Sequence, residues 1–198
     1  MSLLKYENAK LKEQLIFSIP VSMEICGREC KGCYALKPQK RFPKVLEARN
    51  RTYEITKGVH FLKIMNEELR QWDKWLTKNR PYVKQRVIRI HEAGEFYSKD
   101  YIKKWRKIAE ANPDWIFYSF TKRLKDFPKV FKKFRALANV MITDSLLDGK
   151  INFGKRDEGG LTFKCPSTFS NVKCSPEICT WCYQTEGACK NGVYFKQH

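Results

Sequence analysis

Short apolar runs alternate with stretches of helical periodicity between residues 15 and 143, and this alternation restricts the fold more than any other feature. Residues 15–19, 86–91, 115–121 and 139–143 have the length and composition of buried strands. Strands separated by helices form βαβ units, which build a parallel sheet. We therefore expect an α/β fold in which about four to five strands form a short partial (βα) barrel.

Helices are expected in the intervals between these strands, and prolines and capping residues predict where they begin and end. The expected helices begin at Phe42-Pro43, near Phe61, after the cap Ser98, and at Asp126 with Pro128 in the first turn. The second ends at Arg80-Pro81 and the third near Asn112-Pro113. Their apolar faces are rich in aromatic residues, which we assign to the core.

The carboxyl ends of parallel strands meet at one edge of a sheet, where the chemistry of α/β proteins is concentrated. A cysteine-rich loop follows the first strand, and Gly94-Glu95 follows the second. Thr121-Lys122-Arg123 ends the third strand, and Asp144-Ser145 ends the fourth. We expect all four segments to converge there.

The cysteine loop carries Cys26, Cys30 and Cys33 in a C-x3-C-x2-C spacing. Three thiolates at this spacing hold a 4Fe–4S cluster and leave one iron open, which is where S-adenosylmethionine binds in iron–sulfur enzymes. The alternatives are zinc, with His60 or His91 as a fourth ligand, and no metal. We expect the cluster, with these cysteines as catalytic and metal-binding residues.

Several polar residues are placed to bind the cofactor at the same edge. The Glu95 carboxylate, next to Gly94, is expected to accept hydrogen bonds from the ammonium group of a bound amino acid, with Glu92 and His91 as competitors for that role. Tyr34 and Tyr97 are the aromatic residues that we leave free to stack. Contacts to a ribose or carboxylate are expected from Ser119, Thr121, Thr143 and Asp144.

A second group of cysteines lies near the C-terminus. Its members are Cys165, Cys174, Cys179, Cys182 and Cys189. Five thiols exceed one four-ligand site, so either Cys165 or Cys189 is spare, and both a second 4Fe–4S cluster and zinc fit. We expect a core over residues 1–150 and, over residues 151–198, a linker and a small cysteine-rich metal-binding appendage. The appendage is either an auxiliary centre or a staple for the fold.

The chain has 39 Lys and Arg against 21 Asp and Glu, a net charge of +18, which favours a polyanionic partner. We expect nucleic acid or a nucleoprotein. The cations expected to bind it are Lys103, Lys104, Lys107, Lys122, Arg123, Lys129, Lys132 and Lys133. No run approaches the roughly 20 apolar residues that cross a bilayer, so we expect no membrane partner and a cytoplasmic location in a bacterial host.

Two families resemble this chain. The cysteine triad, the strand-end Gly-Glu pair and the alternating order resemble radical S-adenosylmethionine enzymes, in which the cysteines bind the cluster and the Gly-Glu motif holds the methionine amino group. The chain differs from them in having Gly32 before the third cysteine and Ala93-Gly94-Glu95-Phe96 as its second motif.

A closer resemblance, across residues 26–198, is to the phage gene product 88 family. It is carried by CKGCYA (30–35), RIHEAGEFYS (89–98), the W-x6-NP spacing from Trp105, FKCP (163–166), C-x4-C-x2-C and the final VYFKQH.

These features together predict a radical S-adenosylmethionine-like protein that modifies a nucleic acid or nucleoprotein. Such an enzyme requires an electron donor as a further partner. The alternative is an iron–sulfur or zinc accessory protein of a phage or mobile element that binds nucleic acid without turnover.

Overall fold

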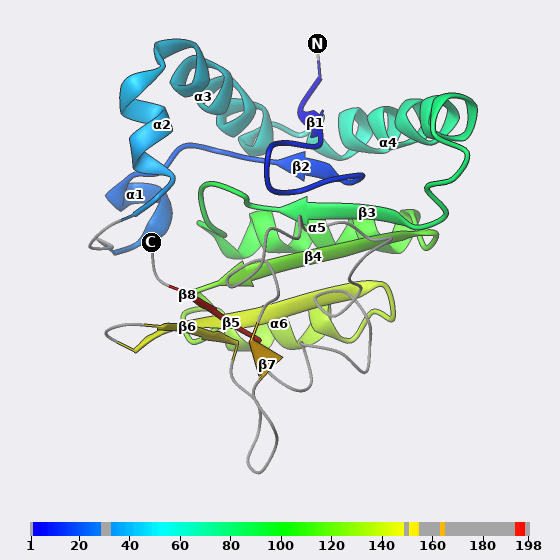
Figure 1. Ribbon diagram of the computed structural model, residues 1–198. Helices are drawn as coiled ribbons and strands as arrows, with labels where there is room; N and C mark the ends of the chain where they lie inside the picture. Colours follow the sequence, from blue (N-terminus) through cyan, green and yellow to red (C-terminus); the bar gives the residue numbers. More distant parts are fainter. Residues whose placement is uncertain (1, 29–32, 149–150, 155–162, 165–192, 197–198) are drawn as a thin grey trace.

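The computed structural model describes residues 2–28, 33–148, 151–154, 163–164 and 193–196, with side chains up to residue 145 (Figure 1). Within these residues the chain forms a mixed α/β fold around one sheet. Five strands form its mostly parallel part: β1 (Leu4–Tyr6), β2 (Leu15–Phe17), β3 (Arg86–Ile90), β4 (Trp115–Thr121) and β5 (Val140–Asp148). The α/β class and the parallel sheet predicted from the sequence are therefore confirmed.

Strands β2 to β5 lie side by side in chain order, and each is parallel to the next. Strand β1 pairs antiparallel with β2 at one edge. On the other side of β5, the sheet continues through β6 (Ile151–Gly154), β8 (Val193–Lys196) and β7 (Phe163–Lys164). Strand β6 falls within the stretch in which the sequence suggested a linker.

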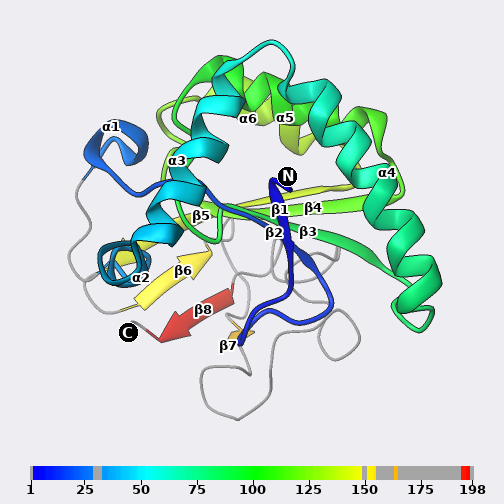
Figure 2. The same cartoon turned by 90° about the horizontal axis from the view of Figure 1, so that it is seen from above.

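Four long helices cover one face of the sheet in an arc (Figure 2). They are α3 (Pro43–Lys57), α4 (Phe61–Asn79), α5 (Lys99–Ala111) and α6 (Pro128–Arg135). Two short helices, α1 (Met23–Cys26) and α2 (Leu36–Arg41), flank the cysteine loop. Within the described residues, no helix has both the length and the apolar composition needed to span a membrane.

A side-chain cap explains where α5 begins, but not where α6 begins. Ser98 has an extended backbone and its Oγ accepts a hydrogen bond from the Tyr101 amide at 3.2 Å, so α5 begins as expected. Helix α6 begins two residues later than expected, at Pro128. The Asp126 carboxylate does not cap it, because it pairs with the guanidinium groups of Arg123 and Arg28.

The main core lies between the helices and the sheet. Aromatic residues of the helices, such as Phe61, Trp105 and Phe134, pack on strand residues such as Phe17 and Phe117, and all five are completely buried. On the opposite face of the sheet, Val87, Tyr118 and Met141 form a smaller buried cluster. The buried side chains of β3, β4 and β5 thus face two apolar layers, one on each face of the sheet.

Candidate functional site

The segments that follow β2, β3 and β4 meet at one edge of the sheet, near the label α1 in Figure 1. The Ile19 amide donates to the Ala93 carbonyl at 3.0 Å, and the Glu92 amide donates to the Phe17 carbonyl at 3.1 Å. These bonds join the segment before the cysteine loop to the segment containing Gly94 and Glu95.

The first arm of the cysteine loop is fixed by a short helix and an arginine. Ser22 caps α1, Ile25 is buried, and Cys26 packs against the main core. Gly27 ends the helix with a φ of +68°, and a Cβ at this position would lie 2.5 Å from Arg123 Nη1. The same nitrogen donates to the Ile25 carbonyl at 3.2 Å. Residue 27 is therefore glycine for two reasons, its left-handed backbone and the close approach of Arg123.

The second arm is fixed by hydrogen bonds of three polar side chains. The Tyr34 hydroxyl donates to the Glu92 carbonyl at 2.7 Å, so its ring is tied to the segment after β3. Arg49, a buried residue of α3, donates to the Ala35 carbonyl at 3.0 Å. The Gln39 amide bonds both the amide and the carbonyl of Val21, at 2.9 and 3.0 Å. Both ends of the cysteine loop are therefore held on the body of the protein.

Two of the three predicted ligands belong to the described residues. Cys26 and Cys33 are both half-buried, and Cys30 lies outside the described residues. Among the residues that the structure describes, no three Cys, His, Asp or Glu side chains form a metal-binding group. The alternative zinc ligands His60 and His91 are therefore not assembled with the described cysteines. The predicted tail ligands Cys165, Cys174, Cys179, Cys182 and Cys189 also lie outside the described residues.

The Glu95 carboxylate is buried and accepts three hydrogen bonds from the protein. The Thr121 hydroxyl and the Phe96 amide donate to Oε1, at 2.6 and 2.9 Å, and the Lys122 amide donates to Oε2 at 3.0 Å. Burial raises the pKa of Glu95, and these hydrogen bonds oppose the rise. The carboxylate joins the segment after β3 to the end of β4.

Gly94 packs against Ile19, in the segment that follows β2. Its φ is +90°, and a Cβ here would collide with the Ile19 side chain and lie 2.9 Å from the Ile19 carbonyl oxygen. The site therefore requires glycine for backbone conformation and for space.

The other polar residues predicted at this edge lie on the neighbouring strands β4 and β5. The Ser119 hydroxyl is buried and donates to the Ile90 carbonyl at 2.7 Å. Thr143 is buried and Asp144 is half-buried, and they pair with Phe120 and Thr121 across the ladder. Thr121 and Glu95 are in direct contact, whereas Ser119 is engaged within the sheet.

His91 lies at the end of β3 with a left-handed backbone, φ +59°. Its Nε2 and the Tyr101 hydroxyl are hydrogen-bonded at 2.9 Å, and its buried Nδ1 has no hydrogen-bond partner among the described residues. Burial lowers the pKa of His91 to about 3, so the imidazole is neutral at physiological pH. Its surroundings are those of a core histidine.

The predicted basic residues have different environments. Lys104 donates to the carbonyls of Thr56, Lys57 and Gly58, at 2.7, 2.9 and 3.0 Å, and so closes the C-terminus of α3. Lys103 pairs with Asp100 at 2.9 Å. The remaining predicted cations on α5 and α6 are exposed: Lys107, Lys129, Lys132 and Lys133. Lys122 and Arg123 are half-buried at the edge of the sheet.

Sequence reasoning missed Arg49 and Gln39 as residues that hold the cysteine loop. Neither belongs to a recognisable motif, and both act on backbone atoms distant in the sequence. Arg123 was predicted only as a cation for nucleic acid, whereas its guanidinium also contacts the cysteine loop.

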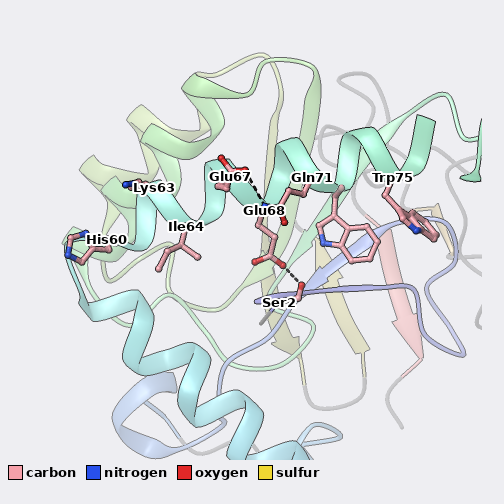
Figure 3. Close-up of a pocket in the computed structure, with 9 residues that line it drawn as sticks. Ser2, His60, Lys63, Ile64, Glu67, Glu68, Gln71 and Trp75 are labelled. Atoms are coloured by element: carbon pink, nitrogen blue, oxygen red, sulfur yellow. Dashed lines mark hydrogen bonds between the residues drawn. The ribbon is translucent and has the colours of Figure 1, made fainter. Parts of the chain in front are cut away.

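An open groove of about 810 Å³ runs along α4 beside the N-terminal residues (Figure 3). Its wall includes Lys63, Ile64, Gln71 and Trp75, and the Glu68 carboxylate accepts hydrogen bonds from the amides of Leu3 and Leu4. Of the candidate metal ligands that the structure describes, only His60 lines it. The groove is therefore separate from the edge that carries the cysteine loop.

Comparison with known proteins places the chain in a family. The family model described as Gene product 88 matches residues 2–152. The Gene 88 protein of Mycobacterium phage L5 is 25% identical over 109 residues, which are 54% of this chain and 43% of that protein. The chain thus spans less than half the length of this relative, and no solved structure matches it significantly. The expected resemblance within residues 163–198 lies outside the matched segment. The chain belongs to the phage gene product 88 family.

Proposed function

We propose that this protein holds a 4Fe–4S cluster on Cys26, Cys30 and Cys33 and is a radical S-adenosylmethionine-like enzyme. The observation that carries the proposal is the position of the cysteine loop. It leaves the carboxyl end of β2, both its arms are anchored, and the segments after β3 and β4 contact its first arm or the residues beside it. In parallel α/β proteins this is the edge where cofactors bind.

The donor set fits the proposed cluster. Thiolates are soft ligands that suit iron–sulfur clusters, and the two described thiols lie at the two ends of the loop, on anchored arms. When bound, such a cluster supplies the electron that cleaves the sulfonium bond of S-adenosylmethionine. The protein would contribute a loop whose two described arms are anchored to the segments after β3 and β4.

The topology supports a short partial (βα) barrel. Strands β2 to β5 follow one another in chain order, with α3 to α6 on one face. This is the winding of a (βα) barrel, whereas a doubly wound sheet reverses its strand order and carries helices on both faces.

The three hydrogen bonds that the Glu95 carboxylate accepts favour a positioning role for this residue. A carboxylate already bonded to Thr121, Phe96 and Lys122 has little capacity left for an ammonium group. We infer that Glu95 holds the Gly94 segment against Ile19 and keeps it in register with the end of β4. The amino group of the cofactor would then be recognised by other atoms of this edge.

The basic charge supports nucleic acid or a nucleoprotein as the substrate, with an electron donor as a further partner. The exposed cations of α6 equally support a second candidate, a nucleic-acid-binding accessory protein without turnover. The tail cysteines of residues 165–189 would hold a second 4Fe–4S cluster or zinc in either case.

Iron analysis after anaerobic reconstitution tests the cluster. The variant Cys26→Ser/Cys30→Ser/Cys33→Ser should contain about four fewer iron atoms per chain than the wild type. Met23→Ser, at an exposed position of the same arm, should keep the full iron content. Equal iron in the wild type and the triple variant would exclude the proposed ligands.

Cofactor affinity separates the two candidates. Equilibrium dialysis under anaerobic conditions should show binding of S-adenosylmethionine to the reconstituted wild type and none to the triple cysteine variant. The positioning role predicts that Glu95→Ala keeps its iron and binds the cofactor more weakly. No binding to a wild type with full iron content would support the accessory protein.

A further inference from the structure

We propose that α6 and the loop before it, residues 122–135, form a surface that binds the phosphate backbone of a nucleic-acid duplex and leads it to the cysteine loop. As a statement about the substrate, this inference rests on the proposed function. The binding itself requires only the charges of this surface.

The exposed face of α6 carries one sign of charge. Lys129, Lys132, Lys133 and Arg135 are all exposed, and none forms an ion pair with another described residue. Residues 127–143 contain no Asp or Glu. The opposite face of the helix is apolar, because Phe131 and Phe134 are buried in the core. The two phenylalanines therefore anchor α6 to the core, and its cations face solvent.

The other long helices carry acidic residues beside their cations, and some of these charges form ion pairs. On α4, Arg70 pairs with Glu67, and Asp73 pairs with Arg86 of β3. On α5, Arg106 pairs with Glu110 at 2.6 Å. Lys103 and Lys104 of α5 are also engaged within the protein. Charges of both signs keep a surface soluble, so solubility alone does not explain why α6, alone among the four long helices, lacks acidic residues.

The basic surface is continuous with the cysteine loop. Residues 122–127 connect β4 to α6, and they include the exposed Lys125 and the Arg123 that contacts the Ile25 carbonyl. Arg28, in the first arm of the cysteine loop, lies 3.6 Å from Asp126 of the same segment. A polyanion bound along α6 would therefore meet the proposed centre at the beginning of this helix.

The chemistry of the surface favours the backbone of a duplex. Lysine ammonium groups are point charges that contact phosphates without the bidentate geometry that reads bases. Proteins that bind single strands stack bases on exposed aromatic rings, and α6 offers none because both its phenylalanines are buried. We therefore expect a duplex, bound with little sequence preference and strong salt dependence.

Fluorescence anisotropy with a labelled 25-base-pair DNA duplex tests this surface at several salt concentrations. Lys129→Glu/Lys132→Glu/Lys133→Glu should weaken binding at least tenfold and reduce the salt slope by about two to three. The matched control is Lys63→Glu/Lys74→Glu/Lys78→Glu on α4, which reverses three exposed lysines that form no ion pair with the described residues. It should change affinity less than threefold. Equal loss in both variants, or loss in neither, would overturn the assignment to α6.

Further variants and competitors test whether the lysine charges cause the effect and which polyanion binds. Lys129→Gln/Lys132→Gln/Lys133→Gln should show the same trend, and the arginine equivalents should restore affinity. An RNA duplex should compete as DNA does. If a single strand bound as tightly as the duplex, or polyglutamate of equal charge competed as well, the duplex assignment would be wrong.

The cysteine variant separates this surface from the cluster. Cys26→Ser/Cys30→Ser/Cys33→Ser should bind the duplex within twofold of the wild type. If the α6 variant loses the duplex while the wild type holds no iron, the surface stands and the proposed enzyme fails. If the wild type binds iron and the α6 variant still binds the duplex as tightly as the wild type, only the assignment of duplex binding to α6 is refuted.

Discussion

The guanidinium group of Arg123 lies against the backbone of Gly27, in the space that a side chain at residue 27 would occupy. This contact joins the end of β4 to the first arm of the cysteine loop, because the same guanidinium also bonds the Ile25 carbonyl. The position of Cys26 thus depends on a residue almost one hundred positions away in the sequence.

Substitution of Gly27 should therefore damage the cysteine loop. Gly27→Ala forces a residue with a Cβ into a left-handed backbone and displaces Arg123, and it should cost about 1–3 kcal/mol of unfolding free energy. The reconstituted variant should also bind less iron. Gly58→Ala is the matched control, because its Cβ would meet only the Ile55 carbonyl, at 3.5 Å. Equal stability and iron content in the two variants would refute this role of Gly27.

Glu95→Gln tests the buried carboxylate. The side-chain NH2 group of the glutamine would face the Lys122 amide, so two donors would oppose each other. The substitution should lower the free energy of unfolding by about 1–3 kcal/mol. Because the pKa of Glu95 is raised, the wild type loses stability as the pH rises above 4.5, and the neutral glutamine does not. The stability difference should therefore be largest at low pH. Urea unfolding across pH measures it, and a difference that grows with pH would contradict the raised pKa.

His91→Asn tests the neutral imidazole. With a pKa of about 3 in the fold and 6.5 in the unfolded chain, His91 stabilises the protein above pH 6.5 and loses this contribution as the pH falls toward 3. Asparagine tolerates the left-handed backbone and does not titrate. The slope of unfolding free energy against pH between these values should be lower in the variant by about 1.4 kcal/mol per pH unit. An unchanged slope would mean that His91 is charged in the fold.

Lys104→Met tests the cap of α3. The variant keeps the aliphatic stem and removes the donor to three carbonyls, and it should cost about 1–3 kcal/mol. Lys107→Met, at an exposed position of the same helix, should change stability by less than about 0.5 kcal/mol. Because the Lys104 ammonium group is bonded within the protein, Lys104→Met should leave duplex affinity unchanged. Equal unfolding free energies would show that the cap is unimportant.

Local signals predicted most of the central fold. Strand β4 and helix α5 have the bounds that apolar runs, Ser98 and Asn112-Pro113 indicated. Strand β1 was missed because three residues that pair antiparallel at a sheet edge show no periodicity. Helices α1 and α2 were missed because they are short and depend on contacts such as the one between Gln39 and Val21.

The location of the site could be predicted from the sequence, but the hydrogen bonds within it could not. Strand order and the rule for carboxyl ends brought the cysteine loop, Glu95 and Thr121 to one place. They did not indicate that the Glu95 carboxylate would be saturated by protein donors, because the Lys122 amide and the Thr121 hydroxyl reach it only through the register of β4. Lys104 likewise resembles any surface lysine until α3 and α5 are packed together.

Electron paramagnetic resonance of anaerobically purified, dithionite-reduced protein tests the central claim most directly. The wild type should give a reduced 4Fe–4S signal that shifts when S-adenosylmethionine is added. This signal should be absent from the Cys26→Ser/Cys30→Ser/Cys33→Ser variant, in which any remaining signal from the tail would not respond to the cofactor. A wild-type signal that is indifferent to S-adenosylmethionine, or that persists unchanged in the variant, would contradict the proposed centre.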